Sequence, residues 1–181
     1  MNAKRLVVLS GCSGGGKTTL LAELKRRGFA VVEEPGRQIV REQLESGGIA
    51  LPWQDAHAFI ELVLSHSVAN YCAALEMPES AFFDRGVVDA VNYFPQHKLA
   101  MPKHFSDATE RCRYHSHVFL APPWEEIFGA DRERRHTFAS AVAEYESLTL
   151  TYPKFGYEIM VLPKVSVQAR ADFVLSRLES I

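Results

Sequence analysis

The segment from Gly11 to Thr18 carries the residue types that bind phosphate groups. It reads Gly-Cys-Ser-Gly-Gly-Gly-Lys-Thr, which fits the Walker A pattern of Gly, four free positions, Gly, Lys, and Ser or Thr. Glycines allow the backbone to curl so that successive N–H groups face an anion at the start of a helix. The segment therefore predicts a phosphate-binding loop (P-loop).

Within this loop, Lys17 is expected to reach the β- and γ-phosphates of a nucleoside triphosphate, and the Thr18 hydroxyl is expected to ligate Mg²⁺. The nucleotide-binding candidates of the loop and its following residue are Gly11, Ser13, Gly14, Gly15, Gly16, Lys17, Thr18 and Thr19. The predicted chemistry is the binding of ATP or GTP together with Mg²⁺.

Acidic residues follow two apolar runs further along the chain. Glu34 comes after residues 29–33, and Asp84 follows Ala81 to Phe83. In open α/β sheets the carboxyl ends of the strands surround the ligand, so both acids should face the bound phosphates. Either carboxylate could accept the proton of an attacking hydroxyl. The alternative is that they only cap helices or pair with arginines.

Short apolar runs and helical patterns alternate along the chain. Strands are predicted at residues 6–9, 29–33, 81–84, 118–120 and 159–162. Helices are predicted at residues 18–27, 37–45, 53–75, 87–93, 138–148 and 167–178, with one more between 102 and 114. Right-handed crossovers between such strands give a parallel sheet covered by helices on both faces. The expected fold class is therefore three-layer α/β with five parallel strands.

Composition bounds the class of protein. A chain of 181 residues, 47% hydrophobic and 23% charged, suits one domain over residues 1–181 with a full core. The formal net charge of -2 gives no overall basic field that would attract nucleic acid or an anionic membrane. We therefore expect any anion binding to be local.

Cysteine usage and the first residues of the chain point to the cytoplasm. Cys12, Cys72 and Cys112 are too few and too scattered for a disulfide framework, and each is expected to be a small buried hydrophobe. The apolar run from Leu6 to Leu9 is too short for a signal sequence or a membrane span. The seven histidines show no spacing typical of metal ligands.

The order of these landmarks resembles the P-loop kinases of small molecules. The likeness is greatest to the AAA-type group that includes the ribosylnicotinamide kinases, and more distant to the deoxynucleoside kinases. It is carried by the loop, by Glu34-Pro35, Asp84-Arg85, the arginine-rich stretch 132–135 and Val161-Leu162-Pro163. The resemblance implies the strand order 2-3-1-4-5 and places Asp84 near Mg²⁺, with Asp84 or Glu34 as the base.

The resemblance also implies a lid at about residues 122–136, whose arginines close over the transferring phosphate. Arg132 and Arg135 would then bind nucleotide phosphates, and Arg134 would join Arg85 in catalysis. The alternative is a solvated, charged helix start with Asp131 and Glu133 as partners. Arg85 is expected to contact either phosphate or Glu34, and Arg37 is a weaker candidate on the substrate side.

The sequence defines the phosphoryl acceptor and the nucleobase less closely. Trp53, Phe59 and Tyr93 could line an acceptor pocket, although aromatic residues at helical spacing are more often core. The chain lacks an Asn-Lys-x-Asp guanine motif, which favours ATP and leaves GTP as the alternative.

Three functions compete. The first is a kinase that transfers the γ-phosphoryl group of ATP to a small metabolite such as a nucleoside-like compound, acting as a monomer or homodimer. The second is a regulatory ATPase or GTPase that acts as a switch without a small-molecule acceptor. The third, a nucleic-acid end kinase, would need a basic groove. That groove is hinted at only by Lys98, Lys103, His104, Arg111 and Arg113.

Overall fold

The computed structural model describes residues 5–128 and 137–179 of the chain. Its strands are β1 (Leu6–Gly11), β2 (Ala30–Val32), β3 (Ala81–Asp84), β4 (His117–Ala121) and β5 (Glu158–Val161). Its helices are α1 (Lys17–Arg26), α2 (Pro35–Ser46), α3 (Ala56–Leu75), α4 (Val87–Val91), α5 (Tyr93–Gln96), α6 (Lys103–Arg111), α7 (Glu125–Phe128), α8 (Phe138–Lys154) and α9 (Val167–Glu179).

All five strands are parallel and lie in the order β2-β3-β1-β4-β5. The predicted sheet and its strand order are thus confirmed. β1 lies in the middle, with Leu9 opposite both Asp84 of β3 and Phe119 of β4. This register brings the end of β1, which leads into the P-loop, beside the acidic end of β3.

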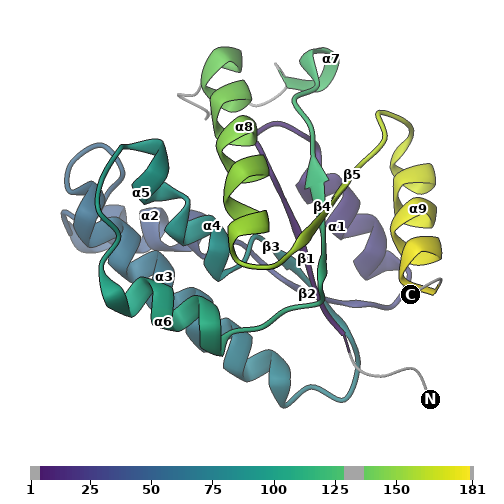
Figure 1. Cartoon of the computed structure of the whole chain (residues 1–181), viewed down its shortest axis with the longest axis horizontal. Helices are drawn as coiled ribbons and strands as arrows, with labels where there is room; N and C mark the ends of the chain where they lie inside the picture. The colour runs from purple at the N-terminus through teal and green to yellow at the C-terminus, as the bar shows by residue number, and fades with distance from the viewer. Residues whose placement is uncertain (1–4, 129–136, 180–181) are drawn as a thin grey trace.

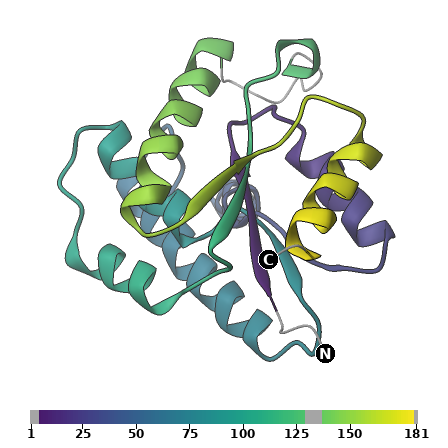
Figure 2. The ribbon, with the colours of Figure 1, turned by 45° about the vertical axis from the view of Figure 1, so that its right-hand side comes forward.

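Helices cover both faces of the sheet (Figures 1 and 2). On one face α1 and α9 pack side by side, and Leu20, Leu24 and Val174 meet the sheet residues Val7 and Leu9. On the other face α3, α4, α6 and α8 surround the larger apolar cluster. β1 is buried along its whole length, as expected for a strand covered on both sides.

The helix starts differ from those predicted by two residues or more in two places. α2 begins at Pro35 rather than Arg37, because a proline fits the first turn, where its missing N–H is not needed. The predicted start of the next helix at Trp53 was wrong, because Asp55 caps α3 and its carboxylate accepts a hydrogen bond from the Ala58 N–H at 2.9 Å. Trp53 therefore lies in the preceding turn and is 52% exposed.

One described helix, α3, is long and apolar enough to cross a membrane, with a mean hydropathy of 1.3 over its most apolar window. Length and composition alone are weak evidence for a span. In this fold α3 packs on α2 and α4, and Ile60, Leu64 and Tyr71 contribute to the core.

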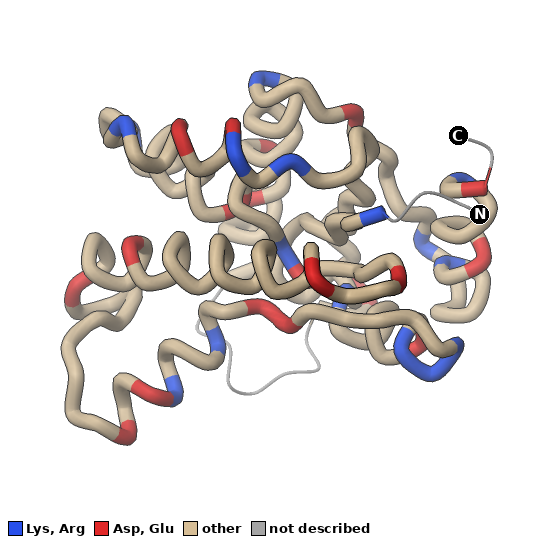
Figure 3. Tube along the Cα trace, turned by 90° about the horizontal axis from the view of Figure 1, so that it is seen from below, with Lys and Arg blue, Asp and Glu red and all other residues tan. Residues whose placement is uncertain are grey.

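Charges and cysteines follow the sequence-based expectations with one exception. Lys and Arg positions are interspersed with Asp and Glu positions along the trace (Figure 3). Cys12 and Cys112 are buried, but Cys72 is exposed. The expectation of a buried Cys72 was wrong, because this residue lies on the side of α3 that faces away from the core.

Candidate nucleotide-binding and phosphoryl-transfer site

The P-loop joins the end of β1 to the first turn of α1, as its sequence predicts. Gly11 has a φ of 116°, and a Cβ atom there would lie 2.3 Å from the Ala121 carbonyl oxygen of β4. Gly16 has a φ of 75° in the left-handed region and caps α1. Glycine is needed at both positions because L side chains rarely adopt these angles.

Lys17 begins α1 and is almost wholly buried. Its ammonium group donates hydrogen bonds to the carbonyl oxygens of Gly11 at 2.9 Å and Cys12 at 2.8 Å. Burial and the nearby Arg85 lower the pKa of Lys17, whereas neighbouring carboxylates oppose that change. The ammonium group is thus held inside the curl of the loop, where a phosphate chain would need it.

Contacts from distant parts of the chain fix the rest of the loop. Arg170 of α9 is buried and donates hydrogen bonds to the carbonyl oxygens of Gly15 at 3.0 Å and Gly16 at 3.3 Å. The Ser13 N–H donates to a carboxylate oxygen of Glu144 in α8 at 3.0 Å.

The remaining loop candidates lie beside these contacts. Gly14 has a φ of 84°, so it too adopts a conformation that favours glycine. Thr19 donates its hydroxyl to the Gly16 carbonyl oxygen at 2.9 Å, and Thr18 is exposed at the start of α1.

Asp84 stands at the carboxyl end of β3 and is 8% exposed. Its Oδ1 atom is buried and has no hydrogen-bond partner among the described residues. Burial raises the pKa of Asp84, while Lys17 opposes the rise and Glu34 adds to it. An unpartnered carboxylate oxygen next to the P-loop suits a hard cation, because Mg²⁺ prefers oxygen ligands.

Arg85 follows Asp84 in a left-handed conformation with φ 69° and turns its guanidinium toward carboxylates on three sides. Nη2 lies 2.8 Å from Glu144, Nη1 lies 3.3 Å from Asp89 and Nε lies 3.2 Å from Glu34. The Nε–H pairs with Glu34 by charge alone, since the atoms lack hydrogen-bond geometry. Burial acts to lower the pKa of Arg85, but the surrounding carboxylates raise it well above its usual range.

Glu144 and Asp89 complete this cluster. Burial acts to raise the pKa of Glu144, but Arg85 and Lys17 lower it on balance. Asp89 accepts hydrogen bonds from the Gly86 N–H at 2.8 Å and from the hydroxyls of Ser10 and Tyr152. We name Lys17, Glu34, Asp84, Arg85, Asp89 and Glu144 the charged cluster.

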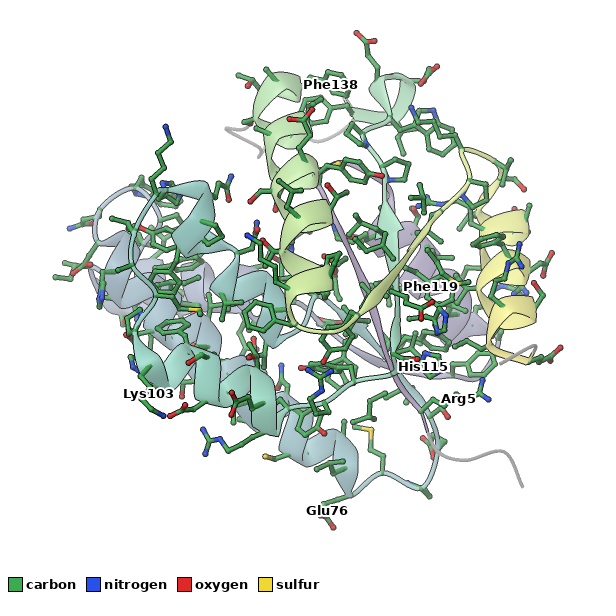
Figure 4. The ribbon with its side chains drawn as sticks, in the orientation of Figure 1. Arg5, Glu76, Lys103, His115, Phe119 and Phe138 are labelled. Carbon is green, nitrogen blue, oxygen red and sulfur yellow. The ribbon has the colours of Figure 1, made fainter. Side chains whose placement is uncertain are left out.

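The other predicted residues fall into two groups. Arg132, Arg134 and Arg135 of the expected lid lie outside the described residues. Two described residues close to these arginines in the sequence are in contact. The Phe128 ring of α7 packs edge-on against the Phe138 ring of α8, with centroids 5.2 Å apart. Phe138 lies at the start of α8, whereas Arg5 and His115 lie at the opposite end of the sheet (Figure 4).

One of the three aromatic candidates for the acceptor pocket, Phe59, lies near Glu34. A Cβ atom on Gly36 would lie 3.4 Å from a Glu34 carboxylate oxygen and 3.5 Å from the Phe59 ring. Tyr93 instead packs on Phe94 and His97. Arg37 lies 3.8 Å from Glu34 with half of its side chain exposed.

Sequence reasoning missed Asp89, Glu144 and Arg170. Asp89 had a local signal, since an acid three residues after Gly86 can bind the free N–H at a helix start. Arg170 had one too, because it interrupts the apolar face that Val167, Ala171 and Val174 form. Glu144 had none, because only the fold brings α8 to the P-loop.

Among the described residues, no group of three or more His, Cys, Asp or Glu side chains could hold a metal ion by itself. A magnesium site here would therefore need oxygen ligands from a bound phosphate chain, which is the usual arrangement for Mg²⁺. Two surface pockets of about 310 and 240 Å³ lie away from the P-loop, one between α5 and α8 and one beside Arg113 and His115.

Solved structures of kinases share this fold at low sequence identity. A deoxyadenosine kinase from M. mycoides with bound dATP aligns with a TM-score of 0.59 and 13% identity, covering 97% of this chain and 99% of that one. A thymidylate kinase from Ehrlichia chaffeensis gives 0.64 and 11%, covering 97% and 98%. The NadR protein in complex with NR gives 0.71 and 17%, covering 98% of this chain but only 52% of NadR.

Among proteins with curated descriptions, none matches the sequence significantly. Residues 6–170, however, match the model of a protein family described as an AAA domain. That match runs from β1 to the arginine of α9 that holds the P-loop. With its Walker A loop and its kinase-like sheet order, the chain belongs to this AAA domain family of P-loop proteins.

Proposed function

We propose that the protein is a P-loop kinase that transfers the γ-phosphoryl group of Mg-ATP to a small metabolite such as a nucleoside-like compound. The observation that carries this proposal is the charged cluster, which gathers Asp84 and Glu34 beside Lys17. Phosphoryl transfer depends on positioning and on charge stabilisation rather than on covalent chemistry. A carboxylate beside a phosphate-binding lysine meets that need.

In this mechanism the P-loop N–H groups and Lys17 bind the phosphates of ATP, with GTP as the alternative nucleotide. Thr18 and Asp84 would hold Mg²⁺, which neutralises charge on the phosphate oxygens. The unpartnered Oδ1 atom of Asp84 supports this assignment. Arg132, Arg134 and Arg135 are proposed to close over the phosphates from the lid.

The base that accepts the acceptor's proton is Asp84 or Glu34, and the geometry favours Asp84. Glu34 already faces Arg85 at 3.2 Å, whereas Asp84 has an unpartnered oxygen, which is open to the proton when Asp84 holds Mg²⁺ through a water molecule. If Asp84 is the base, Asp84→Asn should lower kcat by at least about a hundredfold, and Glu34→Gln should lower it less. The reverse order would assign the base to Glu34.

A coupled assay of ADP release with Mg-ATP tests the proposal. Nucleosides, nucleotides and vitamin-like alcohols serve as acceptors, and Lys17→Ala is compared with Lys25→Ala, which removes an exposed lysine from the last turn of the same helix. We expect one acceptor class to stimulate ADP release in the wild type and in Lys25→Ala but not in Lys17→Ala. Equal activity in the two variants would contradict a role for the P-loop.

One observation favours the second candidate, a regulatory ATPase or GTPase. Glu144 of α8 accepts a hydrogen bond from the Ser13 N–H of the P-loop, so a nucleotide that engages this N–H group would displace the Glu144 carboxylate from the loop. In that case nucleotide would bind and change the protease sensitivity of α8, while no acceptor would stimulate turnover.

The proposal also covers the domain organisation, cellular location and oligomeric state of the protein. We infer a single domain over residues 1–181 that acts in the cytoplasm as a monomer or homodimer, without a membrane or nucleic-acid partner. The positive and negative residues interspersed along the trace (Figure 3) and the free cysteines of the described residues support it. Sedimentation at several protein concentrations tests the oligomeric state.

A further inference from the structure

A pocket of about 240 Å³ lies at the start of β1, at the end of the sheet opposite the P-loop. Its walls come from the first residues of β1, the last two turns of α3 and the segment that leads into β4. Arg5, Arg113 and His115 line it together with two tyrosines and two leucines, and Figure 4 shows Arg5 and His115 at this end. The lining residues include no acid, and the proposed phosphoryl transfer makes no use of them.

Hydrogen bonds and ring packing hold the walls of this pocket together. The His115 N–H donates to the Leu6 carbonyl oxygen at 2.8 Å, which ties the segment before β4 to β1. The Tyr71 hydroxyl of α3 donates to the Arg113 carbonyl oxygen at 3.0 Å. The Tyr71 ring also packs edge-on against the Tyr114 ring, with centroids 5.1 Å apart. The pocket is therefore built from elements of the core.

The two arginines of the pocket carry charges that no acid neutralises within the described part of the chain, where neither Arg5 nor Arg113 forms an ion pair. Arg113 lies over the Tyr157 ring, with Cζ 4.5 Å from the centroid, and its Nη1 donates to the Phe155 carbonyl oxygen at 2.9 Å. These contacts position the guanidinium group, and the hydrogen bond to Phe155 uses one of its five N–H donors. Both arginines are thus available to an external anion.

His115 adds a neutral hydrogen-bond donor. Burial lowers the pKa of His115, and the nearby Arg5 adds to this effect, so its ring is neutral at neutral pH. The Nδ1 atom accepts the His117 N–H at 3.2 Å, which leaves the ring proton on Nε2. Glu158, an acid at the same end of the sheet, already faces His117 at 3.1 Å. Two positive charges and a neutral donor match a phosphate dianion.

We propose that this pocket binds a small phosphate monoester, with Arg5 and Arg113 at its phosphate group and Tyr71 and Leu75 at its apolar body. Arginine binds phosphate oxygens through adjacent N–H groups that form a planar fork. The volume of about 240 Å³ lies below the roughly 300–1,000 Å³ of pockets for drug-sized ligands, so the ligand is a small compound. Because the pocket is separate from the P-loop, this ligand and a nucleotide can be bound together.

Amide chemical shifts of the full chain labelled with ¹⁵N distinguish this pocket from the P-loop, which also binds phosphate. Phenyl phosphate is titrated, with phenol and inorganic phosphate as matched probes. We expect saturable shifts at Leu6, Leu75 and His115, and a Kd for phenyl phosphate at least roughly tenfold below that for phenol. Shifts confined to residues 11–18, or equal Kd values for phenol and phenyl phosphate, would overturn the proposal. Inorganic phosphate that binds as tightly as phenyl phosphate would overturn the preference for a monoester.

Variants of single arginines test which charges bind the phosphate group. Arg113→Gln removes a charge that lines the pocket, whereas Arg111→Gln removes one from an exposed position outside it, at the end of α6. We expect the Kd for phenyl phosphate to rise roughly tenfold or more in Arg113→Gln and less than about twofold in Arg111→Gln. Arg5→Gln should raise it as Arg113→Gln does, without removing the contact with Tyr157. Unchanged Kd values in both pocket variants would refute the assignment of the phosphate group to these arginines.

Discussion

Gly11 and Gly28 both adopt positive φ angles, yet their surroundings differ. A Cβ atom on Gly11 would lie 2.3 Å from the Ala121 carbonyl oxygen, whereas a Cβ atom on Gly28 would meet nothing within 4 Å. Gly28→Ala should therefore lower the free energy of unfolding by only about 1–2 kcal/mol of backbone strain. Gly11→Ala should lower it by at least about 3 kcal/mol, because the sheet must also shift.

Urea unfolding of the two variants measures both losses. Similar losses would show that β4 yields to a side chain at the start of the P-loop, and would contradict the close packing that we describe there.

Arg85 stabilises the acids around it. In Arg85→Met, Asp89 and Glu144 would lose their cation while staying largely buried, which should lower the free energy of unfolding by about 3–5 kcal/mol. Arg37→Met is the matched control, because Arg37 is half-exposed and only 3.8 Å from Glu34. This control should change stability by less than about 0.5 kcal/mol. Equal effects in chemical denaturation would refute the structural role of Arg85.

At the scale of single residues, the sequence predicted those that belong to a local sequence pattern. Lys17 and the glycines were found because the Walker A spacing is itself a backbone requirement, and Asp84 and Glu34 were found because each follows a strand. The contact of Arg85 with Glu34 was among the two expected outcomes and is confirmed. Glu144 could not be found, because its partners are 59 and 131 positions away and only the packing of α8 joins them.

At the scale of elements, ion pairs between side chains join the end of α1 to α9. Glu23 pairs with Arg26 at 2.7 Å and Arg27 at 2.8 Å, and Arg27 also reaches Asp172 of α9 at 2.6 Å. Hydrogen bonds from Arg26 and from Arg27, which caps the end of α1, lower the pKa of Glu23 to about 2. A carboxyl whose pKa is lowered by folding stabilises the protein above its unfolded pKa, and this contribution is lost as pH falls toward 2.

Glu23→Gln should therefore lower the Tm at neutral pH, and its difference from the wild type should shrink as pH falls from the usual glutamate pKa toward 2. Thermal unfolding at a series of pH values measures this. Glu45→Gln, at an exposed position of α2, should show no such trend. A constant difference across the series for Glu23→Gln would argue against the ion pairs.

One tie between α8 and α4 is a buried hydroxyl. Tyr152 is buried and donates its hydroxyl to Asp89. Tyr152→Phe should lower the free energy of unfolding by about 1.5–3 kcal/mol, since the lost hydrogen bond has a charged acceptor. Tyr145→Phe, half-buried in the same helix, should lower it by less than about 1 kcal/mol. Denaturant midpoints of the two variants decide whether this hydroxyl joins the elements.

Element starts were the least predictable part of the fold. The aromatic and apolar residues from Trp53 onward suggested a helix, but the Asp55 carboxylate accepts the Ala58 N–H and caps α3, which starts at Ala56, three residues later than that pattern. For the strands, short apolar runs that end at glycine or proline were sufficient to predict where each strand lies. All five were located to within one or two residues at each end.

For the whole molecule, both helical layers could be predicted because connections between parallel strands are right-handed, whereas the sheet order was predicted from the resemblance to the P-loop kinases. What composition could not give is how the two layers meet the P-loop. Arg170 of α9 donates hydrogen bonds to carbonyl groups of the P-loop, and Glu144 of α8 accepts one from the Ser13 N–H. These contacts arise only when all elements are assembled, and they make the loop a junction of both layers.

The most direct test of the proposed function follows the γ-phosphoryl group itself. The protein is incubated with γ-labelled ATP, Mg²⁺ and the acceptor that stimulates ADP release most, and the label is separated into organic product and inorganic phosphate. If the charged cluster serves a kinase, the label will appear in an acceptor monophosphate and will vanish from it in Asp84→Asn. Label found only as inorganic phosphate, at a rate that no acceptor changes, would contradict a kinase and identify a nucleotide-hydrolysing switch.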